Sequence, residues 1–151
     1  MDSNVIKLEA QKFFEAKFKE TRPTRPAFVC PSLNKLLEVD AINLIRPFTF
    51  LEIKEAIWEC ASDKAPGPDD YNFGFIKHFW NVLKDDFLNF FEKFHLDGKI
   101  SNGCGSSFLT LIPKVFDPLY FNEYRLISLI GCIPKTIYMV LARRIKPVME
   151  G

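Results

Sequence analysis

The sequence predicts an α+β fold that is mostly helical and contains one β-hairpin. Apolar residues recur at helical spacing over much of the chain, two strand-like runs occur at 107–115 and 124–130, and proline or glycine separates the segments. A chain of 151 residues is long enough to bury a core of its own. Its 16 phenylalanines exceed what such a core requires, which predicts an exposed aromatic surface available for a partner or for self-association.

The first part of the chain is predicted to be helical, with one long loop. Residues 4–20 carry apolar side chains at helical spacing, the prolines within 21–32 predict a loop, and 33–45 is typical of a short helix. Thr49 and Glu52 have the spacing of a capping box, in which each residue satisfies an orphan backbone donor of the other. A further helix is therefore expected to begin after Thr49.

The second part is predicted to contain a long helix, a hairpin and a last helix. Residues 73–96 are strongly patterned at helical spacing with aromatic residues on the apolar face. The runs at 107–115 and 124–130 are expected to pair as an antiparallel hairpin with a long connection. Pro134 suits the first turn of a helix that runs to about Lys146.

Composition narrows the class of protein without naming a function. The net charge of +1 gives no electrostatic footprint for nucleic acid over the whole chain, although a local basic patch stays open. No apolar run reaches the length of a transmembrane helix, and the N-terminus lacks the order of a signal peptide. The four cysteines are far apart in the sequence and form no CxxC pair: Cys30, Cys60, Cys104 and Cys132. This spacing argues against a zinc site and favours reduced thiols in an intracellular protein, either nuclear or cytoplasmic.

Lys114 and Arg125 lie on the two predicted strands. Two cations on paired strands make a clamp for a phosphate or triphosphate, which arginine can bind with two parallel hydrogen bonds. Charged residues on a hairpin are also commonly solvated surface residues. The spacing alone therefore leaves both interpretations open.

A second basic cluster lies on the last predicted helix. Its cations are candidate contacts for a phosphate backbone: Lys135, Arg143, Arg144 and Lys146. Cations near the C-terminal end of a helix also complement the helix dipole, which explains the cluster equally well. His78 and His95 have no Asp or Ser partner pattern and are interpreted as core or surface residues.

Neither pair of adjacent aspartates resembles a two-metal site. Asp69 and Asp70 precede the long helix, where either of them or Asn72 can serve as its N-cap. Asp85-Asp86 lies in the middle of that helix, where neighbouring side chains point in different directions and are expected to be solvated.

Five motifs, in the same order and at similar intervals, resemble the fingers region of a LINE-type non-LTR retrotransposon reverse transcriptase, particularly the plant kind. In this chain they read Lys64-Ala65-Pro66-Gly67-Pro68-Asp69, Phe79-Trp80, Ser106-Ser107-Phe108-Leu109, Leu111-Ile112-Pro113-Lys114 and Tyr124-Arg125-Leu126-Ile127-Ser128-Leu129. The agreement runs from about residue 47 to residue 146. Residues 1–46 resemble a helical connector upstream of the polymerase, and residues 47–151 a partial fingers domain, truncated before the palm.

The resemblance implies roles for several residues in RNA-directed DNA synthesis. Lys114 and Arg125 would contact the triphosphate of the incoming deoxynucleotide. The turn would shape the side of the fingers that faces the RNA or DNA template, through Lys64, Pro66, Gly67, Pro68 and Asp69. Synthesis needs two magnesium ions held by palm aspartates, which in the family lie beyond the position that matches Gly151. The chain is therefore expected to be a non-catalytic remnant without a metal site or a cofactor of its own.

The chain also departs from the family within its motifs. Asp70 stands where the turn usually has glycine, and a positive φ at that position would cost free energy. Leu126 replaces a proline, and Cys132-Ile133-Pro134-Lys135 replaces the usual start of the next helix. Two alternatives to the remnant stay open: a stand-alone nucleic-acid-binding module and a protein-interaction module that uses the phenylalanine surface. A gene model truncated ahead of the palm is also open.

Overall fold

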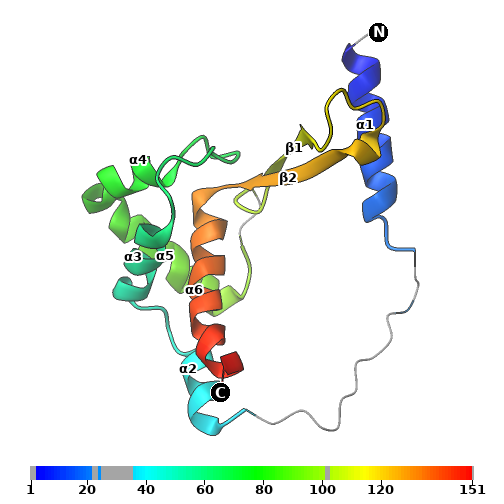
Figure 1. Ribbon diagram of the computed structural model, residues 1–151. Helices are drawn as coiled ribbons and strands as arrows, with labels where there is room; N and C mark the ends of the chain where they lie inside the picture. The colour runs from blue at the N-terminus through cyan, green and yellow to red at the C-terminus, as the bar shows by residue number, and fades with distance from the viewer. Residues whose placement is uncertain (1–2, 22–23, 25–35, 101–102, 151) are drawn as a thin grey trace. The chain divides into compact units, whose positions relative to one another are not determined.

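Helices and one two-stranded antiparallel sheet form the described part of this computed structural model, which comprises residues 3–21, 24, 36–100 and 103–150. The elements in order are α1 (Ser3–Phe18), α2 (Glu38–Ile45), α3 (Phe50–Glu59), α4 (Phe73–His78), α5 (Trp80–Asp97), β1 (Ser107–Pro113), a 3-10 turn (Phe121–Glu123), β2 (Tyr124–Ile130) and α6 (Cys132–Glu150) (Figure 1). The predicted α+β class with one hairpin is confirmed. No helix within the described residues is long and apolar enough to cross a membrane.

Contacts divide the chain into two units. The hairpin unit contains residues 1–34 and 111–126, and the helical unit contains residues 35–110 and 127–151. The strands β1 and β2 contribute residues to both units. The predicted domain boundary after residue 46 stays a prediction; within the helical unit, α2 packs against α6.

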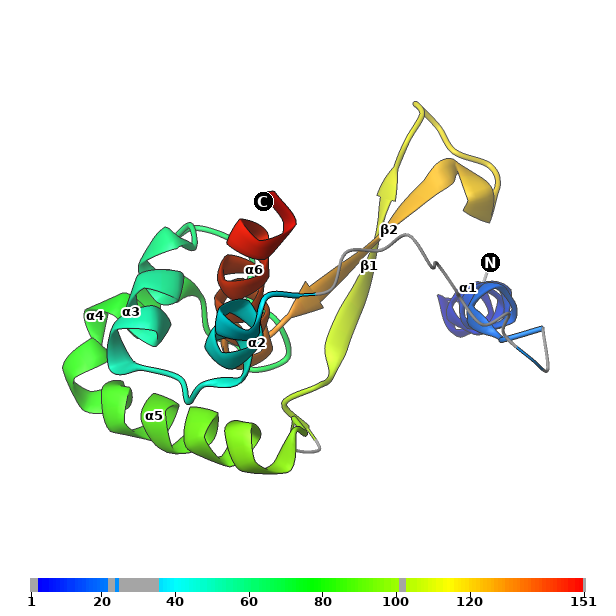
Figure 2. The ribbon, with the colours of Figure 1, turned by 90° about the horizontal axis from the view of Figure 1, so that it is seen from below.

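The core of the helical unit forms where α3, α4, α5 and α6 meet, and Figure 2 shows α6 beside α2 and α3. Each helix contributes apolar residues at helical spacing, so burial of one face per helix stabilises the packing. The buried apolar residues are Ile53, Ala56, Ile57, Cys60, Phe73, Ile76, Trp80, Phe87, Phe91, Cys132, Ile137 and Val140.

Side-chain caps fix the start of two helices. The Thr49 hydroxyl accepts the Glu52 N–H at 3.2 Å, and the Glu52 carboxylate accepts the Thr49 N–H at 2.9 Å. This reciprocal pair confirms the capping box predicted before α3. The Asn72 side chain accepts the Phe75 N–H at 2.9 Å, so Asn72 is the predicted residue that caps α4.

The prediction of a single long helix over residues 73–96 is wrong in one respect, because the helix is interrupted at Phe79, between α4 and α5. Phe79 has φ −97° and ψ 19°, outside the helical range, and its carbonyl accepts the N–H groups of Val82 and Leu83. The break leaves Phe79 43% exposed while Trp80 enters the core at 6% exposure. Trp80 then contacts the rings of Phe50, Trp58 and Phe87. Tertiary packing of Trp80 therefore overrides a local pattern that contains no proline or glycine at the break.

Other boundaries also differ from the prediction by a few residues. The second helix begins at Glu38, not at 33, and residues 33–35 lie outside the described part of the chain, as does nearly all of the predicted loop at 21–32. The first strand ends at Pro113, which has no N–H to donate to a ladder. The last helix begins at Cys132 and places Pro134 in its first turn as predicted.

One guanidinium joins three helices of the helical unit. Arg144 of α6 donates to both carboxylate oxygens of Glu52 at 2.9 and 3.1 Å. It also donates to the carbonyl groups of Leu44, Arg46 and Pro47 at 3.2, 2.6 and 2.9 Å. Its side chain is only 6% exposed and lies over the Phe48 ring. All three nitrogens of the guanidinium are therefore engaged, and they fix α6 against the α2–α3 connection.

The same cluster sets the protonation of Glu52. Partial burial by itself raises the pKa of this carboxyl, but hydrogen bonds from Arg144 and Thr49 outweigh burial and lower the pKa from 4.5 to about 2. Arg46 is a second cation beside this carboxylate, at 3.0 Å. Glu52 is thus a capping residue, an ion-pair partner and an acid that stays charged well below neutral pH.

Replacing Arg144 by lysine is expected to lower the free energy of unfolding by about 2–4 kcal/mol, because an ammonium cannot satisfy the carboxylate and three carbonyls together. Arg143→Lys is the matched control. Arg143 pairs with Glu55 and Glu59, and its side chain is 38% exposed, so the loss should stay below about 1 kcal/mol. Urea unfolding of the two variants measures the difference; equal losses would contradict the structural role of Arg144.

Acid should weaken the fold through Glu52. Because its pKa is lower in the folded chain, the stabilisation is complete above about pH 4.5 and is lost as pH falls toward 2. The loss from this one group is expected to be about 3 kcal/mol, measured by urea unfolding across that range. Glu52→Gln should flatten the acid limb, whereas Glu55→Gln, at an exposed pair, should leave it unchanged. An acid limb that keeps its slope in Glu52→Gln would refute this assignment.

Candidate functional site

The register of the hairpin is set by one hydrogen bond at its outer end. The Lys114 N–H donates to the Glu123 carbonyl at 2.8 Å. Continued along an antiparallel ladder, this register sets Pro113 opposite Tyr124 and Ser107 opposite Ile130, which are the ends of β1 and β2. The hydrogen bond and the strand bounds therefore agree on one register.

Lys114 and Arg125 lie at the same end of the hairpin. Arg125 is on β2, as predicted, opposite Ile112, but the prediction that Lys114 lies on a strand is wrong by one residue, because β1 ends at Pro113. Lys114 follows β1 directly and is joined to the connection by its hydrogen bond to Glu123. Both residues are exposed, and both belong to the hairpin unit.

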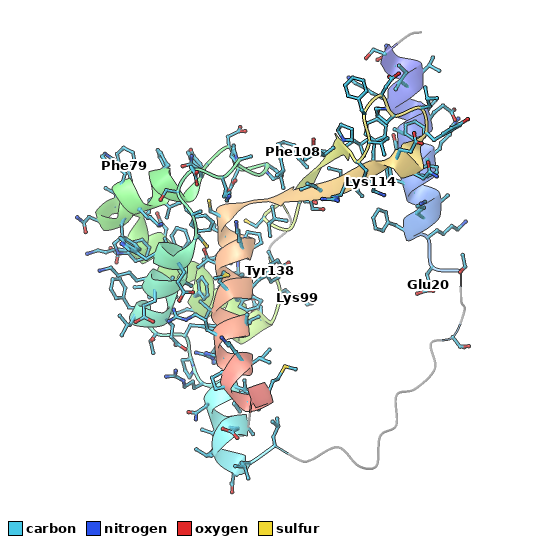
Figure 3. The ribbon with its side chains drawn as sticks, in the orientation of Figure 1. Glu20, Phe79, Lys99, Phe108, Lys114 and Tyr138 are labelled. Carbon is cyan, nitrogen blue, oxygen red and sulfur yellow. The ribbon has the colours of Figure 1, made fainter. Side chains whose placement is uncertain are left out.

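Lys114 is also anchored by its side chain. Its Nζ donates to the Asn122 carbonyl at 2.9 Å, and Figure 3 labels it at the hairpin. An ammonium has three donors, so one hydrogen bond to Asn122 leaves capacity for an anion. No hydrogen bond or ion pair of the Arg125 side chain is found with another described residue. The pair thus combines one positioned cation with one guanidinium for which the described residues provide no partner.

The connection between the strands is organised by Glu123, which the sequence does not single out. Its carboxylate accepts the N–H groups of Leu119 and Tyr120 at 2.7 and 3.0 Å. The Asn122 carbonyl accepts the Lys114 side chain, and the Glu123 carbonyl accepts the Lys114 N–H. The sequence does not predict this role, because an acidic residue just before a strand is compatible with many other roles.

The Pro-Gly-Pro-Asp turn packs against the junction of β2 and α6. A Cβ added to Gly67 would lie 2.4 Å from the Ile130 carbonyl carbon and 2.5 Å from the Gly131 nitrogen, so only glycine fits. The Asp69 carboxylate accepts the Cys132 N–H at 2.7 Å and thereby caps α6. The turn therefore has a structural function, and its role on a template side stays a prediction.

Two details of the turn bear on the sequence predictions. Asp69 is a helix cap, but for α6 and not for the helix that follows it in sequence, because its partner is 63 residues further along the chain. Asp70 has φ 57°, so the position that is glycine in the family does require a left-handed backbone here. Lys64 and Pro66 are exposed beside the buried Gly67.

The basic residues of α6 do not form one surface. Arg144 is held within the helical unit as described, and Arg143 pairs with Glu55 at 2.6 Å. Lys135 is half-buried with its Nζ 5.4 Å from the centre of the Phe73 ring, and Lys146 is exposed. Phosphate contacts by this cluster stay a prediction. Arg144 is the least suited of the four residues, because its guanidinium is buried and already bonded.

The buried thiols are poorly suited to nucleophilic chemistry. Burial raises the pKa of Cys132 to about 12, and the nearby Asp69 carboxylate adds to the shift. Burial likewise raises the pKa of Cys60. Their S–H groups donate to backbone carbonyls of Tyr71 and Ala56. Both cysteines are therefore packing residues.

Among the described residues, the paired aspartates do not fit the two-magnesium site that the family resemblance implies for a complete polymerase. Asp69 uses a carboxylate oxygen to cap α6, and Asp85 and Asp86 are exposed on α5. Within the described residues no three His, Cys, Asp or Glu side chains are arranged to hold a metal ion.

Comparison with known proteins points to a transposon. No protein-family model matches the chain. The chain is similar to the transposon TX1 uncharacterized 149 kDa protein of Xenopus laevis, with 27% identity over 107 residues. The matched region is 71% of this chain but 8% of that protein, so the chain spans a small part of its relative. The similarity supports a transposon-related origin.

Gly67→Ala is expected to lower the free energy of unfolding by about 1–3 kcal/mol, because its Cβ would overlap the backbone of Ile130 and Gly131. Gly105→Ala is the matched control, since a Cβ there meets nothing within 4 Å. That variant should change stability by less than about 1 kcal/mol. Thermal or urea unfolding compares the two, and a tolerated Gly67→Ala would show that the close approach has little energetic importance.

Proposed function

We propose that this chain is the fingers portion of a LINE-type non-LTR retrotransposon reverse transcriptase, in which Lys114 and Arg125 contact the triphosphate of an incoming deoxynucleotide. The observation that carries the proposal is that the two exposed cations lie at the same end of the hairpin, Arg125 on β2 and Lys114 directly after β1. A triphosphate offers several anionic oxygens, so two cations can bind it together.

Three further observations support the proposal. Five motifs of the family occur in order in this chain. The chain is similar to a transposon protein over most of its length. The positive φ at Asp70 also fits a turn that carries glycine in the family.

The proposal assigns these residues nucleotide contact and no catalytic step. Magnesium, where the complete family enzyme binds it, supplies the charge stabilisation for phosphoryl transfer. In the part of the chain that the structure describes, the carboxylates are not arranged to hold such ions, so no reaction step is assigned to them.

The direct test is binding of a deoxynucleoside triphosphate to the full chain at low ionic strength. Lys114→Ala and Arg125→Ala should each weaken binding about tenfold or more, because each removes a charge-assisted hydrogen bond. Lys99→Ala removes an exposed cation of the helical unit and serves as the control (Figure 3). Equal affinity in all four proteins, or no binding by the unaltered chain, would refute the proposed function.

Raised salt separates this function from general nucleic-acid binding. Contacts to a polynucleotide backbone give a steep linear fall of log affinity with log salt concentration. If a single-stranded oligonucleotide binds with such a slope while triphosphate does not compete, the nucleic-acid-binding module replaces the nucleotide site as the better account.

A further inference from the structure

We infer that α1 braces the connection between β1 and β2, and that Phe13 and Phe14 position Lys114 through their contact with Phe121. The part of this inference that concerns nucleotide binding rests on the proposed function. All the residues involved belong to the hairpin unit, so the argument uses contacts within one unit.

The contact consists of three aromatic rings. Phe13 and Phe14 meet edge-to-face, with ring centres 5.1 Å apart and planes at 88°. Phe121, the first residue of the 3-10 turn, lies 5.4 Å from Phe13 and 6.4 Å from Phe14. These distances fall within the range of favourable aromatic pairs, which contribute beyond the area they bury.

Phe13 and Phe14 are among the least exposed residues of α1. Every residue described in the helix is exposed apart from Ala10, Phe13 and Phe14, and none is fully buried. The next segment of the interface is an apolar groove of about 500 Å³, with Val5 and Ile6 on one wall and Leu119 and Tyr120 on the other. The ring contacts of Phe121 with Phe13 and Phe14 lie beside this groove and join α1 to the connection.

The turn that Phe121 anchors holds Lys114 at two points. The Asn122 carbonyl accepts Lys114 Nζ at 2.9 Å, and the Glu123 carbonyl accepts the Lys114 N–H at 2.8 Å. Glu123 also holds the N–H groups of Leu119 and Tyr120. Movement of Phe121 therefore moves both acceptors of Lys114, whereas Arg125 is held by the ladder alone. Phe13, Phe14 and Phe121 are positioning residues for Lys114.

The experiment combines amide hydrogen exchange with triphosphate binding in the full chain. Phe13→Asp/Phe14→Asp removes the brace from α1, and Phe121→Ala removes it from the connection. Phe18→Asp is the control, because Phe18 lies on the same helix and is 71% exposed. The first two variants should speed exchange of the Lys114 and Tyr120 amides about tenfold or more, while Phe18→Asp should leave it unchanged.

Exchange in the helical unit serves as the internal reference. Amides of Ile57 and Ile137, both fully buried, should keep their protection in every variant, which separates loss of the brace from unfolding of the chain. Unchanged exchange at Lys114 and Tyr120 in both brace variants would overturn the inference. An equal increase in the exchange of these two amides in the Phe18→Asp variant would also overturn the inference. The effect would then come from the negative charge added to α1 and not from loss of the rings.

Triphosphate affinity gives a second readout that a purely structural brace would not alter. The brace variants should weaken binding several-fold, and this loss should disappear in a Lys114→Ala background, where the positioned group is absent. A loss that persists in Lys114→Ala would overturn the positioning role. If the unaltered chain binds no triphosphate, the proposed function fails, and the exchange results alone decide whether α1 braces the connection.

Discussion

The helical unit depends on the guanidinium of Arg144. It reaches the Glu52 carboxylate, which caps α3, and the carbonyls at the end of α2 and in the connection to α3. These carbonyls belong to a helix end and a proline-containing connection, so they have no partners in regular secondary structure. With the Arg144 side chain 6% exposed, each unmet hydrogen bond would be costly in this setting. The orientations of α2, α3 and α6 therefore depend on one another through a single side chain.

A second tight junction links the sequence motifs to the hairpin. Gly67 allows the turn to touch the backbone of Ile130 and Gly131, and Asp69 caps α6 at the next residue. The turn therefore determines where β2 ends and α6 begins. Arg125 is the second residue of the strand whose last residue, Ile130, meets Gly67 of the turn.

Local features of the fold were predictable from the sequence, and long-range ones were not. The capping box at Thr49, the hairpin strands and Pro134 in a first helical turn depend on residues within a few positions of one another. The break at Phe79 depends on how Trp80 packs, which no local pattern encodes. For the site, the resemblance named Lys114 and Arg125, but the Asn122 acceptor required the geometry of the turn. The basic cluster of α6 showed the same limit, since the partners of Arg144 lie about 100 residues earlier.

The hairpin tip has a consequence for how much the chain can vary. Residues 111–126 interrupt the helical unit, and the residues that flank them, Thr110 and Ile127, lie opposite each other in the register of the ladder. When the two ends of a segment are already held side by side, lengthening the segment costs little loop-closure free energy. Doubling its length costs only about 0.6 kcal/mol. The helical unit is therefore insulated from insertions and deletions in the tip. Sequence drift can lengthen or shorten the reach of the cation-bearing hairpin while the helices that carry it keep their packing.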